Sequence, residues 1–235
     1  MPYLINKSAQ SVTVYGREST PISVVDTYVN EGATTTCNGT NVDNSVRVGT
    51  GLRRFTLIRF DLSTVNITSI QFAKLILTRS TAGLTADMTV TLHRLLTNWP
   101  NEAITQTPAS LGGATWRRSV DYNGSGGDVE WAEGAISAAD FNSDIIDSAI
   151  VSTVSSNGAV YEFDVTTYIN GLIANIYQNY GLLLKTEAGG FVNFGSQQAV
   201  LSSSSPRIVV GNGVGGAPRR PRAWPWSMHG FRSRR

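Results

Sequence analysis

The chain has 235 residues and a net charge of +2, and 41% of its residues are hydrophobic but only 15% charged. This length is sufficient for a sizeable core and is common for a single β-sandwich domain. A single cysteine, Cys37, excludes an internal disulfide, and we expect a buried or loop thiol and not a nucleophile. No apolar run approaches the length of a membrane-spanning helix, and the N-terminus lacks the pattern of a signal peptide.

Alternating apolar and polar residues predict strands along the first half of the chain. Residues 1–22 form an arm with one strand at Ser11–Tyr15. Residues 24–100 are expected to be strands joined by turns of glycine, asparagine and threonine. The clearest alternation runs from Ser45 to Leu77, which is the period of half-buried strands with one wet face.

The second half is predicted to be less regular. Residues 101–135 form a long insert rich in glycine, and Ala138–Ile146 is predicted to be a short helical turn. A helix begins at Asp164, capped by Asp164 or Thr166. Its apolar face repeats at helical spacing through Val165, Ile169, Leu172, Ile173 and Ile176. Tyr180–Lys185 and Arg207–Val210 are predicted as closing strands.

Several short motifs occur in a fixed order between residues 24 and 210. They include Asp26–Val29, Leu57–Leu62, Ala73–Leu77, Val90–Arg94 leading to Trp99, Ala114–Trp116, Tyr161–Thr166 and Ser205–Val210. As a set, this resembles the DNRLRE-type domain family, which are β-sandwiches similar to carbohydrate-binding modules. The name-giving hexapeptide does not occur in this chain. The resemblance implies the fold and a secreted setting, and for some members it implies polysaccharide binding.

Four aromatic residues gather around the insert: Trp99, Trp116, Tyr122 and Trp131. Exposed rings would stack on the faces of sugar rings, which makes these four the possible glycan-binding residues. The alternative is that they cover the edge of the sandwich and anchor the loop. We favour core packing for Trp99 and Trp116, and exposure for Tyr122 and Trp131 because their neighbours in sequence are polar.

The charge is unevenly distributed. The last 25 residues hold six arginines and no acid, whereas the first 210 hold 13 basic and 17 acidic residues. A basic tail therefore follows an acidic body. Three interpretations compete: a solvated extension, an arm that docks on an acidic partner, and a nucleic-acid contact, the least favoured. Docking agrees best with the aromatic residues of the tail. The expected partner-binding residues are Arg219, Arg220, Arg222, Trp224, Trp226 and Phe231.

Motifs for catalysis are missing from the sequence. His93 lies in a strand pattern and is expected to be a surface residue or one with satisfied hydrogen bonds, and His229 lies in the tail. The acids Asp121, Asp128, Glu130 and Glu133 leave open a glycosidase-like carboxylate pair or a structural calcium site. No ligand spacing supports a metal, so we predict no catalytic residue, no metal and no cofactor.

Together, these features predict an all-β, jelly-roll-like antiparallel β-sandwich with one or two short helices and extended terminal arms. Its parts are an arm at 1–22, a β-sandwich domain at 23–210 and a tail at 211–235. The leading functional hypothesis is a non-enzymatic virion structural protein, a capsid decoration or cement protein of a tailed phage. Its expected partners are the major capsid protein or another virion protein, its own copies as an oligomer such as a trimer, and host surface polysaccharide. The alternative is a carbohydrate-binding or adhesion module of a phage fibre or a cell surface.

Overall fold

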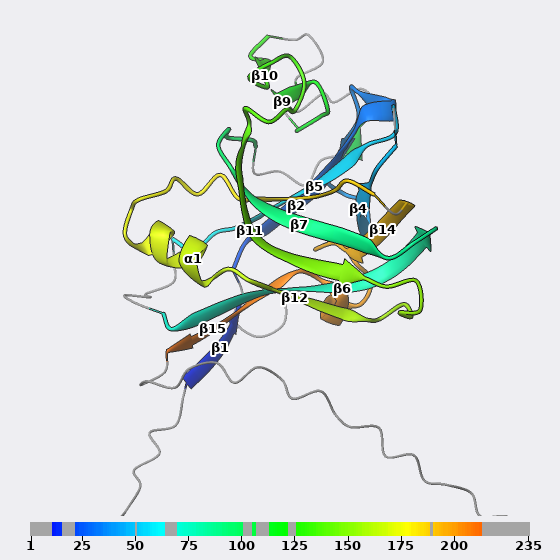
Figure 1. The fold of residues 1–235 in the computed structure, drawn as a ribbon. Coiled ribbons are helices and arrows are strands. Elements are labelled where there is room, and N and C mark those ends of the chain that lie inside the picture. Colours follow the sequence, from blue (N-terminus) through cyan, green and yellow to red (C-terminus); the bar gives the residue numbers. More distant parts are fainter. Residues whose placement is uncertain are drawn as a thin grey trace, which may run out of the picture.

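The computed structural model describes residues 11–15, 22–49, 51–63, 70–100, 105–106, 113–121, 126–188 and 190–212. These residues form fifteen strands, two short 3-10 turns, η1 (Glu31–Ala33) and η2 (Ser202–Ser204), and one α-helix. The predicted all-β class is confirmed. All pairings between the strands are antiparallel, and a large curled sheet folds over itself into two layers (Figure 1).

The first layer consists of five antiparallel strands. In spatial order they are β2 (Val24–Asn30), β5 (Arg54–Phe60), β13 (Leu182–Thr186), β7 (Met88–Leu95) and β11 (Phe141–Val151). Strand β7 shows why the sequence alternates: Met88, Val90 and Leu92 face the interior and are fully buried, while Thr89 is exposed on the other side.

The second layer is built around the 13-residue strand β6 (Phe72–Leu84). The strands of this layer are β12 (Val160–Asp164), β15 (Arg207–Asn212), β1 (Ser11–Tyr15), β14 (Gly190–Gly195) and β4 (Asp43–Arg47). The first half of β6 lies between β12 and β15, and its second half pairs with β14. A single residue pair, Arg47 and Arg54, joins this layer to the first through β4 and β5.

The predicted strand Ser11–Tyr15 is confirmed, and it is part of the sheet. Strand β1 pairs along its whole length with β15, so Ser11 lies opposite Asn212 and Tyr15 lies opposite Ile208. The segment predicted as an N-terminal arm thus contributes an edge strand to the sandwich. The residues before Ser11 lie outside the described part of the chain.

The main core lies between the two layers. Both layers supply large side chains that are fully buried, among them Ile58, Leu92 and Leu184 from the first and Leu75, Leu77 and Phe163 from the second. Burying each such side chain contributes about 1.5–3 kcal/mol to folding, which makes this cluster the principal source of stability.

A second core covers the outer face of the first layer. Residues that follow β7 fold back over this face and form a cap, seen above β5 and β7 (Figure 1). The cap contains the short pair β9 (Arg118–Val120) and β10 (Val129–Glu130); beside it, β3 (Cys37–Asn38) pairs with β8 (Thr105–Gln106). The cap therefore buries part of the outer face of the first layer, mainly at β2, β5 and β13, whereas β11 remains largely exposed.

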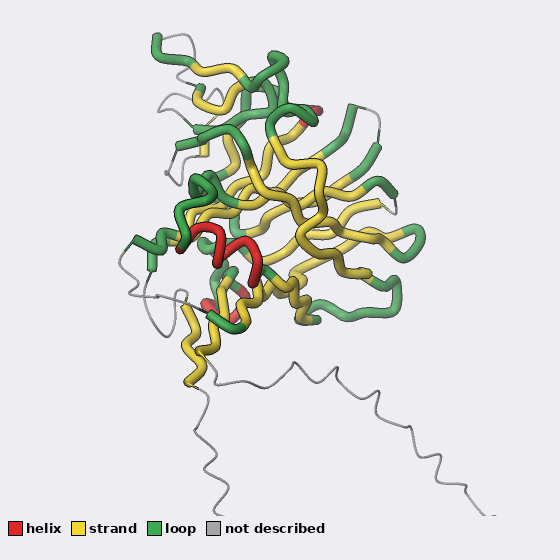
Figure 2. Tube along the Cα trace, turned by 60° about the vertical axis from the view of Figure 1, so that its left-hand side comes forward, coloured by secondary structure: helices red, strands yellow, loops and turns green. Residues whose placement is uncertain are grey.

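The single helix in the described residues is α1 (Thr166–Ile173), which lies against the side of the sandwich (Figure 2). It begins at Thr166, two residues later than predicted, because Asp164 is still the last residue of β12. The N-cap residue is Val165, whose side chain makes no capping hydrogen bond, and the Asp164 carboxylate accepts from the Thr166 amide at 2.9 Å. The helix ends before Ile176, whose side chain is 70% exposed, so the predicted apolar face was one turn too long.

The helical turn predicted for Ala138–Ile146 is wrong. Phe141 begins the eleven-residue strand β11, which pairs with the free edge of β7. Backbone hydrogen bonds to an available sheet edge override the weak local preference of this segment. No helix among the described residues is long and apolar enough to cross a membrane.

Candidate functional site

Part of the predicted sites lies outside the described residues. This holds for Tyr122 and for the whole predicted partner-binding set, Arg219, Arg220, Arg222, Trp224, Trp226 and Phe231. Those predictions stand untested. The remaining three aromatic candidates can be placed.

Trp99 and Trp116 are core residues, as expected, with 1% and 4% of their surface exposed. The Trp99 indole N–H donates to the carbonyl of Tyr180 at 2.7 Å, and the Arg59 guanidinium lies 5.1 Å from the ring centroid. The Trp116 ring packs on Phe55, with centroids 5.2 Å apart. Both tryptophans anchor the cap to the first layer.

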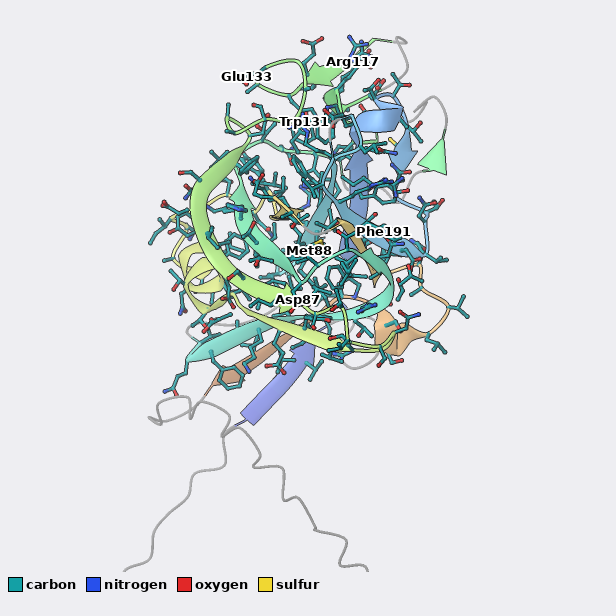
Figure 3. The ribbon with its side chains drawn as sticks, turned by 45° about the vertical axis from the view of Figure 1, so that its right-hand side comes forward. Asp87, Met88, Arg117, Trp131, Glu133 and Phe191 are labelled. Carbon is teal, nitrogen blue, oxygen red and sulfur yellow. The ribbon has the colours of Figure 1, made fainter. Side chains whose placement is uncertain are left out.

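Trp131 was expected to be exposed, and that prediction is wrong. Only 1% of its surface is accessible, and its indole N–H donates to the Thr115 carbonyl at 2.8 Å. Glu130 and Glu133 are exposed. Glu133 lies at the outer end of the molecule, and Trp131 lies further inward (Figure 3). The polar neighbours face water, and the tryptophan alone turns inward. No sugar ring can stack on any of the three tryptophans in this arrangement.

The acids of the insert form an ion-pair cluster. The Arg118 guanidinium contacts the carboxylates of Asp121 at 3.2 Å and Asp128 at 2.8 Å. Glu130 and Glu133 lie on the exposed side. In the part of the chain that the structure describes, no group of three or more acidic, histidine or cysteine side chains is arranged to hold a metal ion.

His93 is a satisfied core histidine, one of the two outcomes expected from the sequence. Its two ring nitrogens lie 2.9 Å from the Asn142 carbonyl and 3.1 Å from the Thr91 hydroxyl. Burial lowers the pKa of the imidazole. Both nitrogens are therefore engaged by the protein itself.

A concave feature with several charged side chains lies at one edge of the sandwich, and we name it the edge groove. It encloses about 570 Å³ between β11, the end of β12, the start of α1 and the residue Tyr177. Its charged residues are Arg94, Asp144, Asp147 and Asp164, and its remaining lining comes from Asn142, Ile145, Ile146, Thr166, Thr167, Tyr168 and Tyr177. Three carboxylates and one guanidinium give the edge groove a net negative charge.

The floor of the edge groove is a stack of an arginine on two tyrosines. The Arg94 guanidinium lies 4.4 Å from the centroid of Tyr177, and the ring of Tyr177 is nearly parallel to that of Tyr168, at 11°. Gly171 makes this stack possible, because a Cβ at that position would lie 2.1 Å from the Tyr177 ring. Burial raises the pKa of Tyr168, which keeps its hydroxyl neutral and donating to Asn179 at 3.1 Å.

Two of the three aspartates are fixed by backbone amides. Asp147 accepts from the amides of Asp164 at 2.6 Å and Ser148 at 2.8 Å, and Asp164 accepts from Thr166. Each still has lone pairs for a ligand. Asp144 is exposed on β11, and Arg94 makes no ion pair with any described residue. The edge groove thus offers acceptors at its rim and a stacked cation at its floor.

The edge groove was not predicted from the sequence. Its charged residues come from β7, β11 and β12, and the first half of β11 was predicted as part of a helical turn at Ala138–Ile146. The proximity of Asp147 to Asp164, 17 positions apart, depends on how β11 and β12 meet. The sequence signal that could have indicated an acidic site was the occurrence of three aspartates, Asp144, Asp147 and Asp164, within 21 positions.

Fold and site together define an all-β, sandwich-like protein with a capped outer face and an acidic groove at one edge. None of the protein-family models that were searched matches this chain. None of the curated proteins searched matches it either.

Proposed function

We propose that this chain is a non-enzymatic structural protein of a virus particle, a capsid decoration protein of a tailed phage. In this proposal it attaches to the major capsid protein or another virion protein through its two terminal segments, as an oligomer at the particle surface. The observation that carries the proposal is the pairing of Ser11 with Asn212. Because these residues are opposite each other, the segments before and after them start from one corner of the sandwich.

Two segments that leave from one corner suit bivalent attachment. Once one segment has bound a shell subunit, the other is held at high effective concentration near the neighbouring subunit. The C-terminal segment brings arginines for acidic surface groups and Trp224 and Trp226 for apolar pockets. Such contacts stabilise an assembled shell because they form only in the assembled state.

The position of the cap agrees with this proposal. Strands β9 and β10 lie at the end of the molecule opposite β1 and β15 (Figures 1 and 2). A body held by its termini would therefore present the cap outward. Exposed residues at that end, such as Arg117 and Glu133, would face the surroundings of the particle (Figure 3).

Localisation in purified particles tests the proposal. An antibody raised against the folded protein is used on particles from the source that carries this gene, separated on a density gradient. The expected result is that the protein sediments with intact particles and remains with DNA-free shells. Recovery of the protein only in the cell-envelope fraction or free in the medium would contradict the proposal.

The edge groove favours a second candidate, a carbohydrate-binding or adhesion module of a fibre or cell surface. The combination of carboxylate acceptors, amide and guanidinium donors and apolar side chains such as Ile145 suits a polyhydroxylated ligand. Membership in the DNRLRE-type family belongs to this proposal as well. The test is a glycan array with the native chain and with an Asn142→Ala variant: specific binding that the substitution abolishes supports the module, and a blank array argues against it.

A further inference from the structure

The edge groove lies close to the point at which the basic tail begins. We propose that the edge groove binds residues 218–226 of the same chain, which we name the basic segment. This segment contains Arg219, Arg220 and Arg222 followed by two tryptophans. The docking concerns the free protein and does not depend on the proposed function.

The strand register places the start of the tail near the edge groove. Lys74 of β6 pairs with Val209 of β15 on one side and with Asp164 of β12 on the other. Neighbouring strands are about 4.8 Å apart, so Val209 and Asp164 are separated by roughly 10 Å. Asp164 is one of the residues that line the edge groove.

The strand directions are also favourable. Both β12 and β15 run antiparallel to β6, so they run parallel to each other and end at the same end of the sheet. The chain beyond Asn212 therefore starts at the end where α1 and the edge groove follow β12. From Asn212 to Arg219 there are seven residues, which span at most about 25 Å when extended. The basic segment can thus reach the edge groove of its own chain.

Charge and shape are complementary. Asp144, Asp147 and Asp164 offer carboxylates to three arginines, whose planar guanidinium groups match carboxylates in a two-point geometry. Arg94 opposes this attraction, but it is held over Tyr177, and the edge groove remains acidic overall. Ile145 is 55% exposed in the groove wall and provides an apolar contact for a tryptophan ring.

The consequence is a competition between the groove and any acidic partner. While the basic segment is docked in its own chain, its arginines and tryptophans are unavailable to a partner. A partner has to displace the segment. The apparent affinity for the partner is therefore the intrinsic affinity multiplied by the fraction of molecules in which the segment is undocked. In the setting of the proposed function, this would restrain attachment before assembly.

Limited digestion of the full-length native chain by trypsin tests the docking. Cleavage after Arg219 and Arg222 is followed by mass spectrometry and compared with cleavage after Arg232, which lies outside the basic segment. If the segment is docked about 80% of the time, its cleavage is slowed about fivefold, because cleavage follows the open fraction. We expect this protection to be unchanged on dilution.

The matched variants are Asp144→Asn in the groove and Glu162→Gln on the outer face of β12. Asp144→Asn removes an exposed carboxylate that, unlike those of Asp147 and Asp164, accepts no hydrogen bond from the backbone of any described residue. An unchanged midpoint of urea unfolding shows that the variant is folded. We expect it to accelerate cleavage after Arg219 and Arg222 relative to Arg232, and Glu162→Gln to have no effect. Equal cleavage at all three sites in the native chain would overturn the proposal. Protection that vanishes on dilution would also overturn it, because it would identify a second copy of the chain as the source of the docked segment.

Discussion

The Trp131 indole N–H donates to the backbone carbonyl of Thr115 at 2.8 Å, and this bond ties the two described parts of the cap together. Thr115 lies before the segment around β9, and Trp131 directly follows β10. The cap thus has its own interior, closed by a tryptophan that belongs to the same core as Phe55 and Phe141.

Replacing Trp131 tests whether the cap contributes to the stability of the whole domain. Trp131→Ala is expected to lower the free energy of unfolding by about 3–5 kcal/mol, because a large buried side chain leaves a cavity. Trp131→Phe should cost less, since it mainly loses the hydrogen bond to Thr115. Urea unfolding is the measurement, with Val129→Ala, exposed on the adjacent strand, as a control expected to stay within about 0.5 kcal/mol. An unfolding curve unaffected by Trp131→Ala would mean that the ring is not buried.

The buried carboxyl group of Asp26 is expected to make the free energy of unfolding depend on pH. Burial raises the pKa of its carboxyl from 3.8 to about 7, against the lowering effect of the Gln197 amide and of the Asn44 side chain. One carboxylate oxygen accepts from Gln197 at 2.7 Å, and the other has no hydrogen-bond partner. Because the folded state holds the proton more tightly than the unfolded state, this group favours folding below pH 4 and loses that contribution as pH rises to 7.

The variant Asp26→Asn isolates this effect. Relative to the native protein, its free energy of unfolding should rise by about 4 kcal/mol between pH 4 and pH 8, which is the pKa difference converted to energy. Urea unfolding at both pH values provides the comparison, and the difference between the two proteins cancels the contribution of His93. A difference that does not vary with pH would show that Asp26 titrates normally.

Alanine substitutions at Gly181 and Gly158 distinguish the energetic cost of backbone strain from the cost of a steric clash. The φ angles of the two glycines are similar, +93° and +87°, but a Cβ on Gly181 would lie 2.6 Å from the Ile58 carbonyl, whereas Gly158 has nothing within 4 Å. Gly158→Ala should therefore cost only the backbone term, about 1–2 kcal/mol. Gly181→Ala should cost about 1–3 kcal/mol more, because β5 and β13 must move apart. Equal losses in thermal or urea unfolding would contradict the close approach of these strands.

Cys37 is predicted to be unreactive in the folded protein. It is 1% exposed, and burial raises the pKa of its thiol to about 12, with a further contribution from the Asp121 charge. The thiolate is the reactive form, so at pH 8 a disulfide reagent such as Ellman's should react only after unfolding in urea. Since the chain has one cysteine, the signal has a single source. Rapid reaction under native conditions would show that the β3 region opens easily.

Local patterns predicted the strands well where one face of a strand is buried. Alternation predicted the strand Ser11–Tyr15 to the residue, because the period of two is a property of the backbone itself. The error at Ala138–Ile146 arose because a free edge of β7, distant in sequence, accepts this segment. Local preference carries no information about such an edge.

The candidate site was beyond the reach of the sequence for the same reason. Trp131 was expected to be exposed from its polar neighbours, but burial of a single side chain depends on what folds over it. The stack of Arg94 on Tyr177 joins residues 83 positions apart and requires the space left by Gly171. Only tertiary structure brings these residues together with Asp147 and Asp164.

The most direct test of the central proposal is the rebinding of purified protein to particles that have been stripped of it. Native chain is compared with the triple variant Arg219→Gln, Arg220→Gln and Arg222→Gln, with Arg117→Gln at the opposite end as the control. If the protein attaches through its terminal segments, the triple variant should bind the particles at least about tenfold more weakly, because each lost ion pair contributes about 0.5–1 kcal/mol. The control should bind like the native chain. Equal binding of native chain and triple variant, or equal weakening by Arg117→Gln, would contradict it.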